Sequence, residues 1–306
     1  MKKMIVFIVI LLLFIGCNGS ETPSESNENL TILTPRGSAG LSLLDYFVNV
    51  DARAITFVDG TDVLSAELIS ASSGYDVIIA PINLGVRIIE QGNSEYRLLG
   101  VITWGNLFLI QNDDLLESNL PVALFGEGAV PQRVLESVVD LAQFERDIIF
   151  LPGVTEVQAY VLTERAAIAL LAEPALSATL ARAQADGINL SVIMNLQEEW
   201  SSVTGYHNYP QAAIFVRESS FNNNSLAFEQ LITALERVST FSTTPEIVIE
   251  YLSGNEEIFG VGNANIIASA WNGMSINFIY ASEVVSEIET FLNLFGISVN
   301  SDLFIN

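Results

Sequence analysis

The chain has 306 residues, of which 50% are hydrophobic and 16% charged, a composition typical of a packed globular protein rather than a disordered one. Its formal net charge of −24 argues against nucleic acid as a partner, because an acidic surface repels phosphate backbones. A single cysteine, Cys17, excludes an internal disulfide, and a single histidine, His207, excludes a histidine-rich metal centre, so no metal or cofactor is expected.

The first sixteen residues predict an export signal. Lys2 and Lys3 precede an apolar run, 5–15, that is too short for a comfortable membrane span. The run ends in Phe14-Ile15-Gly16-Cys17, which resembles the lipobox of bacterial lipoproteins, although Phe14 stands where leucine is usual. The resemblance implies cleavage after residue 16, lipidation of Cys17 and an extracytoplasmic, membrane-anchored location. An ordinary signal peptide or a membrane anchor with a chance cysteine is the alternative.

Residues 18–29, NGSETPSESNEN, are too polar to pack into a core. Together with Cys17 they are expected to form a lipidated, flexible tether to the folded body.

From residue 30 onward, short apolar β-branched runs alternate with amphipathic stretches. Strands are predicted at 30–33, 54–58, 76–80, 97–102, 107–110, 121–125, 147–151, 167–171, 190–194 and 212–216. Helices are predicted at 41–49, 62–72, 84–91, 132–143, 156–163, 175–184, 225–239, 245–253 and 283–295. This alternation predicts an α/β protein with parallel sheets and helices on both faces.

Several predicted strand-to-helix junctions carry small or turn-forming residues, at 34–40, 81–83, 126–131 and 173–174. Loops at the carboxyl ends of parallel strands are where open α/β sheets bind ligands. The helices that begin there present free backbone N–H groups. These loops are therefore the predicted binding surfaces.

The same segments resemble type II solute-binding proteins of ABC transporters, in the group that takes up nitrate, sulfonates and thiamine-precursor pyrimidines. The opening loop TPRGSAG (34–40), the segment DVIIAPINL (76–84), the turn GEGAVP (126–131), the Glu-Pro turn LAEP (171–174) and the helix LQEEW (196–200) are similar to segments of that group, in the same order. Two departures are Arg36, where the group has a small or hydroxyl residue, and ASAWNGMSINF (268–278), where it has Ile-Pro-x-Cys-Asn-Ile.

The resemblance implies a two-lobed α/β fold of the type II periplasmic-binding-protein kind, with the ligand in a cleft between the lobes. Lobe one is expected at 30–110 and 212–306, and lobe two at 111–211. The implied function is an extracytoplasmic solute-binding lipoprotein, a monomer, which delivers a small organic solute to an ABC permease and its ATPase.

The predicted ligand-binding residues lie at strand ends or crossovers: Thr34, Arg36, Gly37, Ser38, Asn83, Thr103, Trp104, Phe125, Gly126, Gly128, Glu173, Tyr206 and Tyr209. Arg36 suits an anionic group on the solute, or else forms a surface ion pair. Asn83 and Thr103 suit polar solute atoms, although Asn83 could instead cap a helix.

The aromatic candidates, Trp104, Phe125, Tyr206 and Tyr209, suit a heteroaromatic solute, and lobe packing explains each of them equally well. Glu173 suits a solute amine, although a role in its turn is favoured. The turn at Trp271 is a further possible wall of the cleft.

Catalytic motifs are missing from the sequence. It contains no Gly-x-Ser-x-Gly elbow, no phosphate-binding Gly-Lys-Ser/Thr loop and no cysteine after Cys17, so a non-enzyme is expected. Two alternatives remain open: an enzyme on the same fold, similar to menaquinone-pathway proteins, and a lipoprotein that binds a partner protein.

Replacing Cys17 by serine is expected to release the mature chain from membranes, because the serine hydroxyl does not accept the thioether-linked lipid. Fractionation of cells that express Cys17→Ser, together with metabolic labelling by a fatty acid, tests this. Lipid labelling that persists in the variant would exclude Cys17 as the modified residue.

Overall fold

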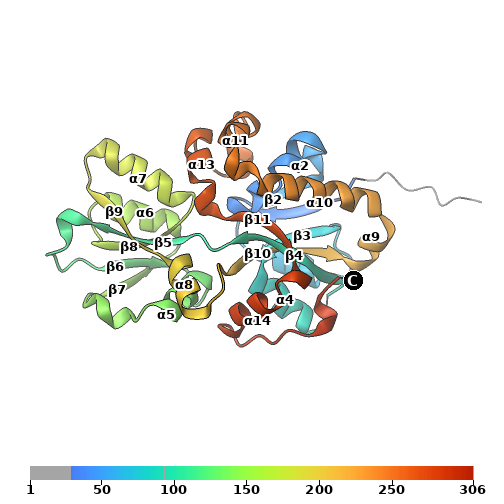
Figure 1. Ribbon diagram of the computed structural model, residues 1–306, viewed down its shortest axis with the longest axis horizontal. Coiled ribbons are helices and arrows are strands. Elements are labelled where there is room, and N and C mark those ends of the chain that lie inside the picture. Colours follow the sequence, from blue (N-terminus) through green and yellow to red (C-terminus); the bar gives the residue numbers. More distant parts are fainter. Residues whose placement is uncertain (1–28, 93, 306) are drawn as a thin grey trace, which may run out of the picture.

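The computed structural model describes residues 29–305 except Asn93, so the predicted signal, Cys17 and the tether up to residue 28 lie outside the described residues. The predicted two-lobed α/β fold is confirmed: two sheets, each covered by helices, are joined at the middle of the molecule (Figure 1). Within the described part, no helix is both long and apolar enough to cross a membrane.

The first sheet has six strands in the order β11-β4-β10-β3-β1-β2. Their bounds are β1 Ile32–Pro35, β2 Ile55–Val58, β3 Val77–Pro81, β4 Tyr96–Trp104, β10 Pro210–Arg217 and β11 Ile276–Tyr280. Strands β1, β2 and β3 run parallel to one another, whereas β10 is antiparallel to β3 and β4, and β11 is antiparallel to β4.

Helices cover both faces of the first sheet because successive strand residues point to opposite sides. Leu33 and Ile78 pack with α3 (Asp62–Ile69), α4 (Ile82–Glu90) and α14 (Val285–Asn293). Ile32 and Ile79 pack with α2 (Leu44–Asn49) and α10 (Ser225–Ser239). The remaining helices of this lobe are α1 Ser38–Leu41, α9 Glu218–Asn223, α11 Pro245–Leu252, α12 Glu256–Phe259 and α13 Ala264–Ala270.

The second sheet has five strands in the order β7-β6-β8-β5-β9. Their bounds are β5 Leu107–Asn112, β6 Val122–Phe125, β7 Ile148–Leu151, β8 Ile168–Ala172 and β9 Leu190–Asn195. Helices α5 (Val130–Val138) and α8 (Leu196–Thr204) pack on one face, and α6 (Val154–Leu162) and α7 (Ala175–Asp186) on the other (Figure 1).

Two short crossovers join the sheets. Gly105 and Asn106 lead from β4 to β5, and residues 205–209 lead from α8 to β10. The boundary expected between residues 110 and 111 falls inside β5, which pairs only within the second sheet. We therefore propose 29–104 and 210–305 as lobe one, and 107–204 as lobe two.

The expectation of parallel sheets was correct for β1 with β2 and β3, and for β6 with β7 and β8. It was wrong for β5 and β10, which run antiparallel to their neighbours because each begins at a crossover and enters its sheet from the opposite end. Strand β11 was not predicted, since INFIY is short and has charged or small residues on both sides.

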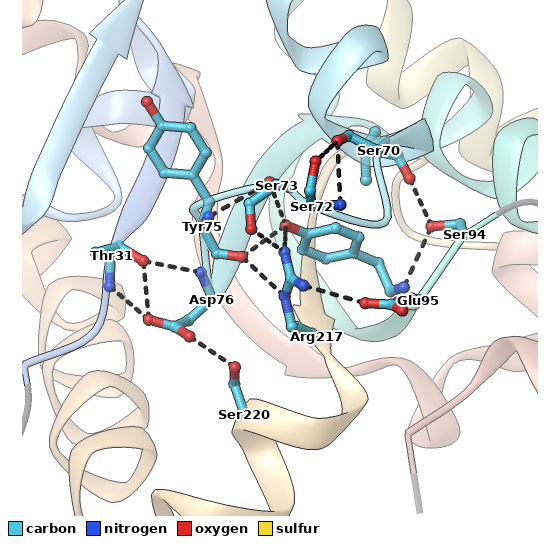
Figure 2. Close-up of polar contacts among 12 residues, drawn as sticks. Thr31, Ser70, Ser72, Ser73, Tyr75, Asp76, Ser94, Glu95, Arg217 and Ser220 are labelled. Carbon is cyan, nitrogen blue, oxygen red and sulfur yellow. Dashed lines mark hydrogen bonds and ion pairs between the residues drawn. The ribbon is translucent and has the colours of Figure 1, made fainter. Parts of the chain in front are cut away.

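A polar network closes the end of the first sheet that lies away from the crossovers (Figure 2). Asp76 accepts hydrogen bonds from the N–H and Oγ1 of Thr31, at 2.9 and 2.8 Å, and from Oγ of Ser220 at 2.6 Å. Arg217 donates to the carbonyls of Ser73 and Tyr75 and pairs with Glu95 at 3.1 Å. Side chains therefore fix the start of β1 and the end of β10.

Replacing Arg217 by alanine is expected to lower the free energy of unfolding by about 2 kcal/mol, because the buried Ser73 carbonyl oxygen loses its donor and Glu95 loses its ion-pair partner. Arg53→Ala is the control, with an expected loss below about 0.5 kcal/mol, since the Arg53 side chain is 91% exposed. Urea unfolding followed by tryptophan fluorescence measures both, and equal losses would contradict the role given to Arg217.

Candidate functional site

The two crossovers are packed directly against each other. The N–H of Gly105 is shared between the carbonyl oxygen of Tyr209 at 2.9 Å and Oδ1 of Asn208 at 3.0 Å. A Cβ at position 105 would lie 2.3 Å from the Tyr209 ring, so only glycine fits there. The connection between the sheets is therefore a close backbone contact rather than a loose linker.

Tyr209 anchors this contact in an aromatic cluster that spans both lobes. Its ring stacks on Phe291 of α14 at 5.9 Å, and Trp200 of α8 meets it edge-on at 5.5 Å. Its hydroxyl donates to Oε1 of Gln197 at 2.9 Å, and burial raises the pKa of that hydroxyl, so it remains a donor. Tyr209 is fully buried, and lobe packing rather than solute stacking occupies its ring.

The carbonyl oxygen of Glu173 in lobe two is hydrogen-bonded both to lobe one and to the first crossover. It accepts from Oγ of Ser38 at 3.3 Å and from Nδ2 of Asn106 at 3.0 Å. The Glu173 N–H in turn donates to the Asn106 carbonyl at 3.0 Å. Ser38 begins α1 in lobe one, Asn106 lies in the crossover and Glu173 follows β8 in lobe two, and we call these three residues the interlobe junction.

The carboxylate of Glu173 lies at the N-terminus of α7. It accepts from the N–H of Ser177 at 3.1 Å and from its Oγ at 2.8 Å. Burial raises the pKa of the Glu173 carboxyl, and the two Ser177 bonds oppose the rise. A Cβ at Gly273 would lie 2.9 Å from Cγ of Glu173, so a turn from lobe one covers this side chain.

Two asparagine oxygens near the lobe boundary are buried without a hydrogen-bond donor: Oδ1 of Asn106 and Oδ1 of Asn83. The orientation of the Asn106 amide is fixed, because the Glu173 carbonyl accepts only from its nitrogen end. Asn83 is the second residue of α4, after the N-cap Pro81, and makes no capping bond. The capping role considered for Asn83 is therefore not seen.

Beside the junction lies a groove made of two adjoining hollows with volumes of about 340 and 400 Å³. The smaller has walls from both lobes, including Phe108, Asn195 and Glu198 of lobe two and Gly273 of lobe one. The larger lies against β11 and α14 of lobe one. Both are lined by His207, Asn208, Asn272 and Ser275. We call the two hollows together the crossover groove.

Tryptophans and polar side chains line the larger hollow. Trp104 donates through Nε1 to the carbonyl of Asn277 at 2.9 Å, whereas Nε1 of Trp271 is buried without a partner. Glu287 contributes a half-buried carboxylate. The structure thus places Trp104 and the turn at Trp271 along one wall, which suits a flat solute with hydrogen-bonding groups.

Arg36 lies elsewhere. Its Nη1 donates to the carbonyls of Glu257 and Ile258 at the end of α12, and its Nε pairs with Asp59 at 3.3 Å. This is the surface ion pair considered as the alternative to an anion site. The residue reaches neither the crossover groove nor the junction by any of these contacts.

Thr34, Thr103 and Gly37 have internal partners. Oγ1 of Thr34 donates to the Pro35 carbonyl at 3.2 Å, and Oγ1 of Thr103 accepts the N–H of Ala212 at 3.1 Å, where β10 bulges against β4. Gly37 has φ 84° and donates to the Phe259 carbonyl at 2.9 Å, which holds the loop before α1. These three residues shape the strand ends.

The other predicted residues lie apart from the junction contacts. Gly126 and Gly128 have φ of 73° and 72° in the turn before α5, where the Gly128 N–H is bonded to Oε1 of Gln132 at 2.6 Å. Phe125 packs into the core of lobe two. Tyr206 is half-buried beside the groove residues His207 and Asn208 in the second crossover.

Sequence reasoning missed Asn106, Asn208 and Glu287. Asn106 could have been predicted, because it is a polar residue between two buried strands and a buried polar residue needs hydrogen-bond partners. Asn208 and Glu287 carried none, because only the folding of distant segments brings them to the groove.

Two sheets joined by two crossovers, with a groove beside them, form the fold of the periplasmic solute-binding proteins. An ABC transporter protein from Parabacteroides distasonis is similar at a TM-score of 0.76 and 17% identity, over 91% of this chain and 99% of that one. No family model and no curated protein matches the sequence.

Two further structures share the fold. The periplasmic aliphatic sulphonate-binding protein of Escherichia coli has a TM-score of 0.60 at 12% identity, over 89% of this chain and 87% of that one. The periplasmic nitrate-binding protein of Synechocystis has a TM-score of 0.55 at 13% identity, over 90% and 83%. The resemblance seen in the sequence is thus confirmed for the fold.

Replacing Arg36 by alanine is expected to lower the free energy of unfolding by about 1 kcal/mol, because the α12 carbonyls and Asp59 lose a partner. Thermal unfolding measures the loss. A fully stable variant that binds its solute more weakly would instead return Arg36 to the binding site.

Proposed function

We propose that this chain is the extracytoplasmic solute-binding component of an ABC importer, and that it carries a small organic solute between its two lobes. The observation that carries the proposal is the crossover groove, whose walls come from both lobes and from the crossover itself. A site shared in this way couples solute binding to the relative position of the lobes.

The lipid anchor, the location and the partners in this proposal come from the sequence. The export signal and Cys17 support a lipid-anchored protein outside the cytoplasm, which works as a monomer with a permease and its ATPase. The interlobe junction supports a hinged closure, since Ser38 and Glu173 contact each other across the lobes and lie on separate elements.

A binder rather than an enzyme is proposed because, among the described groove residues, no carboxylate is hydrogen-bonded to His207. The carboxyl groups of Glu198 and Glu287 line different hollows, and His207 lies in the exposed crossover without a hydrogen-bond partner in the described part. General acid–base chemistry needs a side chain that is held within hydrogen-bond reach of the proton it transfers.

The test is native mass spectrometry of the chain purified from its own host, followed by thermal unfolding with the solute that is released. A solute bound one to one, which raises the melting temperature and is returned unchanged, is expected. Chemical conversion of the solute would establish the enzyme alternative. If no small molecule is found and none from a metabolite library raises the melting temperature, the protein-binding alternative replaces the proposal.

A further inference from the structure

The cations of this chain are all engaged away from the groove. No lysine follows Lys3 in the sequence, and every arginine of the described residues has a partner within its own lobe. These are Arg36, Arg53, Arg87, Arg97, Arg133, Arg146, Arg165, Arg182, Arg217 and Arg237. None of them lines either hollow.

The charges that do line the groove are negative. Glu198 lies in the smaller hollow and Glu287 in the larger, and Glu287 has no ion-pair or hydrogen-bond partner in the described part of the chain. An anion that entered would meet like charges without a counter-ion, within a strongly acidic protein. A cation would instead be attracted by these carboxylates.

The junction beside the groove also presents acceptors. Oδ1 of Asn106 is buried without a donor, and its amide cannot turn over without losing the bond to the Glu173 carbonyl. The Glu173 carboxylate uses two of its lone pairs on Ser177 and has capacity for a further donor. Neither residue lines a hollow, so these acceptors add to the negative surroundings of the groove, whereas Glu198 and Glu287 are the carboxylates that a solute N–H meets directly.

Two helix N-termini of lobe two already hold a protein acceptor. The Glu173 carboxylate lies at the N-terminus of α7 and accepts its Ser177 N–H. At the N-terminus of α8, Oδ1 of Asn195, a residue of the smaller hollow, accepts the Gln197 N–H at 3.1 Å. Protein acceptors therefore fill two positions that an anion would need.

We propose that the solute of the interlobe site is neutral or positively charged and presents N–H donors to the carboxylates of a tryptophan-lined groove that no arginine lines. This inference rests on the proposed function and names the chemical class of its solute. It departs from the anionic group that Arg36 suggested, because Arg36 is held at α12.

The test uses three flat probes of the same size that differ in charge: benzamidine, benzamide and benzoate. Isothermal titration of the purified full chain with Cys17→Ser is expected to give the order benzamidine, benzamide, benzoate, with about tenfold between the extremes. Glu287→Gln is expected to weaken benzamidine about fivefold and benzamide less than about twofold, because it removes only a charge.

Glu289→Gln is the matched control, since Glu289 is exposed on the same helix and does not line the groove. It is expected to change the affinity for either probe by less than about twofold. Equal effects of the two variants would overturn the inference, as would the absence of binding by all three probes.

Tightest binding by benzoate would also overturn the inference. Such a result would leave the proposed function standing, because the groove would still bind a small solute. The proposed function fails by a different result, namely the lack of any bound solute in the purified native protein.

Discussion

The close contact between Gly105 and Tyr209 is the constraint on which the arrangement of the two lobes depends. The missing side chain of Gly105 lets one crossover lie on the ring of the other, and the shared N–H fixes their register. Tyr209 also connects this contact to both lobes, because its ring packs on Phe291 and Trp200 and its hydroxyl donates to Gln197. Asn106, the next residue of the first crossover, is consequently held at the lobe boundary.

The aromatic cluster also divides the crossover region into two chemically different sides. One side is a continuous hydrophobic core, in which Tyr209 is fully buried. The other holds polar groups whose partners are incomplete, such as Oδ1 of Asn106 and Nε1 of Trp271. A buried polar group without a hydrogen-bond partner destabilises the folded protein. Such groups are therefore expected where a ligand or a water molecule supplies the missing bond. Trp271 lines the larger hollow, so one of these unmet hydrogen bonds lies at the candidate site, whereas that of Nε1 of Trp200 lies within the core.

The sequence predicted most of the fold because the strands are short runs of buried β-branched residues, and the helix Ser225–Ser239 was placed to the residue. It did not predict β11 or the antiparallel entry of β5 and β10, which depend on pairing between segments far apart in the chain. For the site, local sequence indicated Glu173 and the turn at Trp271. For Arg36 it left an anion site and a surface ion pair open, because the carbonyls at the end of α12 that accept from Arg36 are more than two hundred residues away.

The unmet acceptor at Asn106 links solute chemistry to lobe closure. In the arrangement described here, Oδ1 of Asn106 is buried without a donor, and a separation of the lobes that exposed it would give it water as a partner. A buried acceptor without a donor costs about 1–3 kcal/mol, so closure without a solute is disfavoured by a factor of about ten. A solute N–H removes that cost only in the closed form, and a ligand shifts an equilibrium by its difference in affinity for the two states. In the proposed function, a solute donor that reached this oxygen would therefore also favour closure of the lobes.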